Sequence, residues 1–250
     1  MPLIVAAAQT ISVAGDVPAN IVNHLRVMQA AANHCVQLLV FPELSLTGYE
    51  PTLAHDLAIL ADDPRLAPMR ELAQKTGMRT VIGAPLKMSV EKGAGIGIAA
   101  LVLQLDGTVS VYTKQHLHPG EEKAFVPGFG GTPVLVDDAK IALAVCADAT
   151  HASHADHAAQ IQPAVYAVGS VITTGSYPAE SAQLAGYAAQ HNMAVLLANH
   201  GGPTGGWSCA GCSAVWAPGG EQVAVAPGLG EFLVIATRND GIWSGEAIAL

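Results

Sequence analysis

The sequence predicts an α/β fold, a sandwich with mixed β-sheets, formed by a single domain over residues 1–250. Short apolar segments typical of buried strands alternate with amphipathic segments typical of helices, which is the order of a layered α/β domain. Two antiparallel hairpins interrupt this alternation, and they favour mixed sheets over a doubly wound parallel sheet. The chain shows no internal repeat and no linker long enough to divide it.

The first elements are the clearest. Residues 2–9 (PLIVAAAQ) form an apolar run that predicts a buried strand. A helix is expected over 16–34, because apolar residues recur at near-helical spacing and Asp16 can cap a first turn that contains a proline. The run VQLLVF (36–41) predicts a second buried strand, which the following proline ends.

The remaining elements follow the same signals. Asp106-Gly107 predicts one hairpin turn and Asp137-Asp138 another. Helices are predicted over 63–75 (stopped by Gly77), 155–160 and 179–191. Strands are predicted over 79–85, 98–105, 108–114, 132–136, 141–145, 164–168 and 193–199. A segment with Gly93, Gly95 and Gly97 precedes the strand over 98–105. The tail supplies three more strands, over 213–217, 221–226 and 231–238.

Composition excludes several function classes. The net charge of −9 argues against nucleic acid as a partner, because phosphate binding needs clustered Lys and Arg, and beyond Lys140 the only basic residue is Arg238. No apolar run approaches the ~18 residues of a membrane span. The N-terminus lacks a basic signal segment, and four cysteines do not form a disulfide framework, so a cytoplasmic location is expected. With 51% hydrophobic and 12% charged residues, a homo-oligomer is expected.

Three chemically distinctive residues each follow a predicted strand. Glu43 comes after VQLLVF, Lys114 ends TVSVYT and Cys146 ends IALAV. Strand ends at one edge of a sheet can converge, and together these groups would form a nucleophilic site: the carboxylate takes the thiol proton and the ammonium stabilises developing negative charge. Taken singly, each residue has an ordinary structural interpretation, as a solvated loop carboxylate, an edge charge and an inert core thiol.

The motifs around these residues resemble those of the nitrilase, or carbon–nitrogen hydrolase, superfamily. FPELSLTGYEP resembles the motif of its general-base glutamate, YTKQHL that of its lysine and AVCAD that of its nucleophile, in the family's order along nearly the whole chain. IVAAAQT, AVLLANHGG and GCSAVWAPGG resemble other family segments. The resemblance implies an α-β-β-α sandwich, commonly dimerised, with a catalytic Glu43-Lys114-Cys146 triad.

The resemblance also implies a reaction and further site residues. Cys146 would attack a small-molecule amide, and Lys114 with the N–H of Ala147 would stabilise the tetrahedral intermediate. Ammonia would leave, and water would release a carboxylic acid from a thioester. Many members carry a second catalytic glutamate, for which Glu121 fits the expected spacing better than Glu122. Two stretches lie where specificity loops are expected, and their Tyr49 and Trp207 are predicted to bind substrate.

Departures from the family pattern narrow the substrate. No arginine or lysine follows the nucleophile in CADATHASHADHA, so a bidentate clamp for a substrate carboxylate is absent there and a neutral amide is favoured over an anionic one. Alanine follows Cys146 in place of the tryptophan typical of true nitrilases, which lowers the case for a C≡N substrate. A nitrilase, or a non-catalytic relative that binds a small amide or regulates a partner, remains the alternative.

The reaction needs no metal or organic cofactor, and two motifs that could suggest a metal are incomplete. Cys209 and Cys212 form one C-x-x-C, whereas a structural zinc site needs four ligands. The spacing of His151, His154 and His157 places them near one helical face, but no acidic cluster completes a ligand set. We expect these histidines to start a helix beside the Cys146 loop, at the rim of the pocket.

Overall fold

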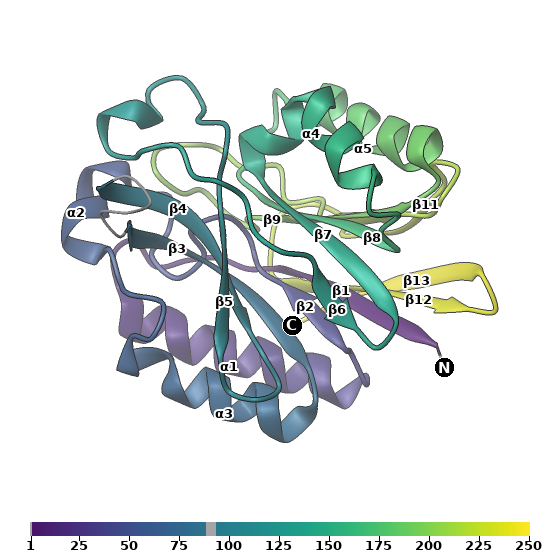
Figure 1. Ribbon diagram of the computed structural model, residues 1–250, viewed down its shortest axis with the longest axis horizontal. Helices are drawn as coiled ribbons and strands as arrows, with labels where there is room; N and C mark the ends of the chain where they lie inside the picture. Colours follow the sequence, from purple (N-terminus) through teal and green to yellow (C-terminus); the bar gives the residue numbers. More distant parts are fainter. Residues whose placement is uncertain (1, 89–93) are drawn as a thin grey trace.

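Two β-sheets lie face to face, and helices cover the outer face of each (Figure 1). The computed structural model describes residues 2–88 and 94–250. The first sheet has the strand order β13-β12-β1-β2-β3-β4-β5, and the second has the order β11-β10-β9-β8-β7-β6. This is the predicted α-β-β-α sandwich with two mixed sheets.

In the first sheet, β1 pairs in parallel with β2 and β2 with β3, while the remaining neighbours are antiparallel. Its strands are β1 (Leu3–Gln9), β2 (Leu38–Val40), β3 (Arg79–Met88), β4 (Gly95–Leu103), β5 (Val109–Thr113), β12 (Phe232–Asn239) and β13 (Ile242–Ala249). The central strands β1 and β2 are almost wholly apolar, because the sheet is covered on both faces.

In the second sheet, β7, β8 and β9 run parallel, and antiparallel strands complete both edges. Its strands are β6 (Val134–Val136), β7 (Ala139–Val145), β8 (Val165–Ser170), β9 (Ala194–Asn199), β10 (Ala214–Trp216) and β11 (Gln222–Val225). The loops that form the site described below follow β2 and β5 in the first sheet and β7, β8 and β9 in the second.

Helices α1 (Val17–Asn33) and α3 (Ala67–Thr76) cover the first sheet, and α4 (Ala152–Ala159) and α5 (Tyr177–His191) cover the second (Figure 1). A one-turn helix, α2 (Ala54–Leu57), lies in the loop after β2. The predicted cap of α1 is present, since the Asp16 carboxylate accepts a hydrogen bond from the N–H of Ala19 at 3.0 Å.

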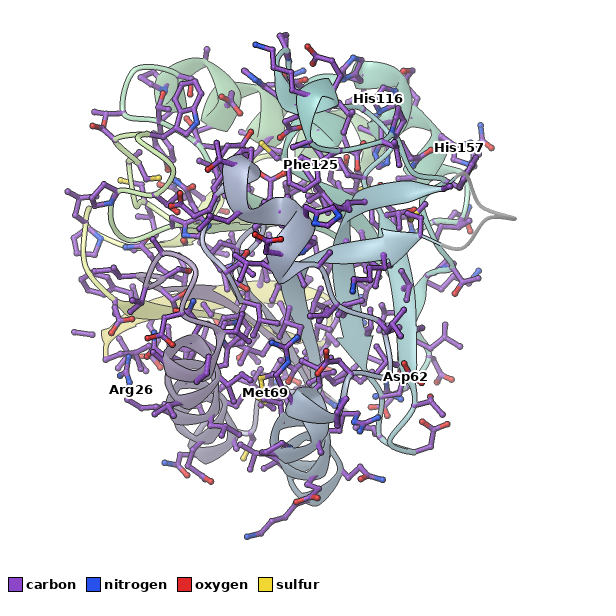
Figure 2. All side chains as sticks on the ribbon, turned by 90° about the vertical axis from the view of Figure 1, so that its left-hand side faces the viewer. Arg26, Asp62, Met69, His116, Phe125 and His157 are labelled. Carbon is purple, nitrogen blue, oxygen red and sulfur yellow. The ribbon has the colours of Figure 1, made fainter. Side chains whose placement is uncertain are left out.

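Three apolar layers hold the sandwich together. One lies between the sheets, one between the first sheet and its helices, and one between the second sheet and its helices. Figure 2 shows Arg26 and Met69 in the helical layer of the first sheet, and His116 and His157 on the side of the second. Many inter-sheet positions hold alanine, which lets the sheets approach closely; they include Ala7, Ala167, Ala194 and Ala198.

The structure corrects some predicted elements. The tail holds four strands, because β13 forms an edge hairpin with β12 that the sequence did not indicate. Small and polar residues fill much of β13, and most of it is exposed, so the apolar alternation typical of a strand is weak there. The helix predicted over 155–160 begins earlier, at Ala152. Gly93, which was placed in the segment before β4, lies outside the described residues.

Candidate active site

The loop after β2 is held against both sheets by two glycines. A Cβ on Gly83 of β3 would lie 2.3 Å from the backbone nitrogen of Leu44, and one on Gly169 of β8 would lie 2.8 Å from the carbonyl oxygen of Phe41. Side chains at either position would push this loop away. The close approach places Glu43, from the first sheet, next to the strand ends of the second.

Lys114 follows β5 and is fully buried. Its ammonium lies 2.7 Å from Oε1 of Glu43 and 2.8 Å from Oε1 of Glu121. Burial alone would lower the pKa of Lys114, but the negative charges around it, of Glu43 first, outweigh burial and raise that pKa. Lys114 is therefore a fixed cation shared by two carboxylates.

Glu43 is suited to accept a proton near neutral pH. Burial raises the pKa of its carboxyl to about 7, although the Lys114 ammonium opposes this shift. One oxygen contacts Lys114, while the other, Oε2, has no hydrogen-bond partner among the described residues. His200 hydrogen-bonds the backbone carbonyl of Glu43 at 2.8 Å and fixes the loop from behind.

Cys146 lies where β7 turns into a short 3₁₀ segment, Cys146–Thr150. Its φ of +46° falls in the left-handed region, which a residue with a side chain rarely adopts and which is common at functional turns. Burial, and then the charge of Glu43, raises the pKa of the thiol to about 12. The thiol is therefore protonated at neutral pH and needs a base before it can attack.

Glu121, rather than Glu122, lies against the lysine. Glu121 is buried, and its Oε1 also accepts the hydroxyl of Tyr49 at 2.8 Å. Its Oε2 accepts the N–H of His118 at 2.8 Å. Glu122 is exposed, and its carboxylate accepts the nearby N–H of Gly120 at 2.7 Å. The 3₁₀ turn that starts at Glu121 aims the first glutamate inward and the second outward.

Glu43, Glu121 and Cys146 line a cavity of about 160 Å³, whereas Lys114, which contacts both glutamates, is not among the lining residues. Roughly 300–1,000 Å³ is usual for drug-sized ligands, so this cavity suits a small molecule. The candidate residues Glu43, Glu121, Cys146, Ala147, Tyr49 and Trp207 all line it, and sequence reasoning missed the others: His118, Thr150, Val171, Thr173, Ser176 and Glu180. Three of the six missed residues (Val171, Thr173 and Ser176) lie between β8 and α5, and Glu180 lies in the first turn of α5, where the sequence carries no recognisable motif.

The two predicted specificity loops meet at the cavity. The N–H of Tyr49 donates to the hydroxyl of Thr204 at 2.8 Å, and the N–H of Gly205 donates to the carboxylate of Glu50 at 3.1 Å. Trp207, in the second loop, is 42% exposed and lies edge-on to the ring of His118, with centroids 6.0 Å apart. The mouth of the cavity is therefore formed jointly by both loops.

The histidines of the first turns of α4 do not line this cavity, and that expectation was wrong. His151 and His157 are exposed, whereas His154 is buried and hydrogen-bonds the hydroxyls of Tyr112 and Tyr166, each at 2.8 Å. His154 lies in the core because its two ring nitrogens hydrogen-bond buried tyrosine hydroxyls. Across residues 2–88 and 94–250, no group of three or more His, Cys, Asp or Glu could hold a metal ion.

A family model described as Carbon-nitrogen hydrolase matches residues 4–242. This chain belongs to the carbon–nitrogen hydrolase family. No curated protein matched it. Within the described part of this carbon–nitrogen hydrolase, no helix is long and apolar enough to cross a membrane.

Solved structures of similar fold include amidases. An amidase from Nesterenkonia sp. has a TM-score of 0.83 and 26% identity, over 95% of this chain and 90% of its own. A cysteine-to-alanine mutant of the amidase from Nesterenkonia sp. AN1, in complex with butyramide, has a TM-score of 0.82 and 25% identity, over 93% of this chain and 89% of its own. A glutamate-to-glutamine mutant of the amidase from Nesterenkonia sp. AN1, with acrylamide added at its active-site cysteine, has a TM-score of 0.82 and 25% identity, over 93% of this chain and 92% of its own.

Proposed function

We propose that this carbon–nitrogen hydrolase is an amidase that uses Cys146 as its nucleophile. The observation that carries the proposal is the position of Lys114, whose buried ammonium lies between two carboxylates beside a protonated thiol. A base of near-neutral pKa and a thiol line one small cavity, and the base contacts a buried cation. These are the groups that acyl transfer from an amide requires.

Acylation begins with a proton transfer. Oε2 of Glu43 takes the proton of the Cys146 thiol, and the sulfur attacks the amide carbonyl carbon to form a tetrahedral intermediate. The negative charge moves to the substrate oxygen, where the ammonium of Lys114 and the N–H of Ala147 stabilise it. As the intermediate collapses, protonated Glu43 gives its proton to the leaving nitrogen, ammonia departs and a thioester remains on Cys146.

Deacylation reverses the order. Glu43 takes a proton from water, and the hydroxide attacks the thioester carbon. The second tetrahedral intermediate uses the same stabilising groups. Its collapse breaks the C–S bond, the thiolate regains the proton from Glu43, and a carboxylic acid leaves. One carboxyl group thus serves all four proton transfers, which suits a pKa of about 7.

Glu121 and Tyr49 position the reacting groups. Glu121 fixes the Lys114 ammonium at 2.8 Å, and the Tyr49 hydroxyl fixes the same glutamate oxygen. Because Glu121 lines the cavity, it is also placed to accept a hydrogen bond from the substrate NH₂ group. Its role is orientation, and Glu43 remains the base.

The proposed substrate is a short amide without a carboxylate. The cavity is small, and neither arginine nor lysine is among its lining residues. The similar amidase in complex with butyramide supports an amide of this size. The nitrilase reaction is the weaker alternative, because Ala147 follows Cys146, whereas true nitrilases typically carry tryptophan at that position.

Ammonia release from short amides, ω-amides, carbamoyl compounds and nitriles tests the proposal. We expect turnover of short amides by the wild type and none by Cys146→Ala. The control is Cys35→Ala, which removes an exposed thiol whose backbone is also left-handed (φ +57°). Ammonia from nitriles alone would indicate a nitrilase. Thermal stabilisation by amides without ammonia would indicate a binding protein. A covalent acyl group on Cys146, seen by mass spectrometry, would support the thioester.

A further inference from the structure

The cavity wall carries a carboxylate that the proposed mechanism does not use. Glu180 lies in the first turn of α5 and lines the same cavity as Cys146. It is half-buried, and no salt bridge forms on its side chain within the part of the chain that the structure describes. Its carboxyl group therefore lies at the cavity wall without a salt-bridge partner among the described residues.

The other charges of the site cannot neutralise Glu180. The ammonium of Lys114 is already engaged by Glu43 and Glu121. Lys114 is not itself a lining residue, and the imidazole of His118 is the one basic side chain among the described residues that line the cavity. Burial raises the pKa of Glu180, while a hydrogen bond from Ser176 and the proximity of His118 oppose this rise. A ligand end that enters this region meets a surplus of negative charge.

An indole ring lines the same cavity as the Glu180 carboxylate. Trp207 lines the cavity and contacts His118 edge-on. The face of an indole ring attracts cations, and a neighbouring carboxylate adds to that attraction. A carboxylate with a tryptophan suits an ammonium group better than it suits either an alkyl chain or an anion.

We propose that Glu180 makes the enzyme selective for short amides whose far end carries an ammonium group, that is, for ω-amino amides. This inference rests on the proposed amidase function and identifies its substrate class. A neutral alkyl amide would remove water from the Glu180 carboxylate and offer no hydrogen bond in return, which is unfavourable. An anionic amide would meet direct repulsion. Only a substrate whose far end is cationic can pair with the Glu180 carboxylate while its amide group reaches Cys146.

The test compares two amides of equal length and shape, pentanamide and 4-aminobutanamide, in which a terminal methyl group is exchanged for an ammonium. We expect the wild type to favour 4-aminobutanamide in kcat/KM by about tenfold or more, because a partly desolvated ion pair contributes at least this much. Glu180→Gln should reduce this ratio by about tenfold. Glu122→Gln, which removes an exposed charge from the neighbouring loop, should leave the ratio as it is.

The ratio separates specificity from structure. A Glu180 that only supports the fold would lower both kcat/KM values in parallel when it is replaced, and the unchanged ratio would overturn the inference. A wild type that hydrolyses pentanamide as well as 4-aminobutanamide overturns it too, but leaves the amidase function intact. Absence of Cys146-dependent ammonia from any amide overturns the proposed function itself.

Discussion

The carboxylate of Asp148 accepts a hydrogen bond from the backbone N–H of Gln115 at 3.0 Å. Gln115 directly follows Lys114, and Asp148 lies two residues after Cys146, so this bond joins the loop of Lys114 to the turn of Cys146. Asp148 is fully buried, and its other oxygen accepts the hydroxyl of Tyr112 at 2.7 Å. The relative position of Lys114 and Cys146 thus depends on one carboxylate that does not itself line the cavity.

Asp148→Asn should lower both stability and kcat. The new amide nitrogen would face hydrogen-bond donors, and a buried donor left without an acceptor costs about 1–3 kcal/mol. Chemical denaturation would measure the stability, and ammonia release would measure kcat. Asp138→Asn changes an exposed turn residue and should behave as the wild type. Full kcat in Asp148→Asn would show that the two loops are held in register by other contacts.

Activity on a neutral amide should rise with pH and reach half its maximum near pH 7. Below its pKa of about 7, Glu43 is protonated and cannot accept the thiol proton; above it, the base is free. A pH profile of kcat/KM with butyramide would measure this, and Glu122→Gln serves as a control that should keep the same profile. A midpoint near 4.3, the approximate value of an ordinary glutamate, would contradict the buried base.

Lys114→Met should abolish activity and destabilise the fold by about 3–5 kcal/mol, because it leaves two buried carboxylates without a cation. Combining it with Glu121→Gln removes one of those charges and should recover part of the stability but none of the activity. Urea denaturation measures the first effect and ammonia release the second. Lys140→Met, at an exposed site, is the matched control. Equal stability of the single and double variants would argue against charge repulsion as the cause.

Tyr49→Phe should lower kcat about tenfold, since it removes the hydrogen bond that orients Glu121. The volume of the side chain is nearly kept, so KM should change much less than kcat. Tyr177→Phe removes a hydroxyl that bonds the carbonyl of Cys212 at 2.9 Å, away from the catalytic residues, and should leave kcat as it is. A change confined to KM would instead place Tyr49 in substrate binding alone.

Gly205→Ala should reduce kcat/KM by separating the two loops at the mouth of the cavity. A Cβ at this position would lie 1.9 Å from the carbonyl oxygen of Tyr49, so one loop must move. Gly206→Ala introduces a side chain into an equally left-handed backbone, but nothing lies within 4 Å of its Cβ. Steady-state kinetics of both variants would separate the contact from backbone strain. Equal losses in the two variants would assign the effect to strain.

The central residues could be predicted from the sequence because the motifs around them resemble those of the carbon–nitrogen hydrolase family. Their places at the ends of predicted strands agreed with convergence in a layered α/β fold, but each residue taken singly also had an ordinary structural interpretation. The choice between Glu121 and Glu122 needed the direction of a short 3₁₀ turn, which spacing alone does not fix. Self-association and the single-domain organisation stay predictions.

Other features depended on tertiary contacts that no local pattern records. Glu180 and Ser176 reach the cavity because α5 begins beside the 3₁₀ turn Cys146–Thr150. The sequence predicts His154 near the start of a helix, but its side chain lies in the core, where it hydrogen-bonds two tyrosine hydroxyls. Strand β13 was missed because its pairing with β12, rather than its own apolar content, defines it.

The proposed base and cation come from the first sheet, and the nucleophile comes from the second. The distance between the proposed base and the Cys146 sulfur is therefore set by the thickness of the alanine-rich layer between the sheets. A larger side chain there, for example at Ala167, would act as a spacer and move the sulfur away from its base without altering any residue that substrate touches. Catalytic rate in this fold should thus respond to interlayer distance, and residues remote from the cavity become a means of tuning turnover.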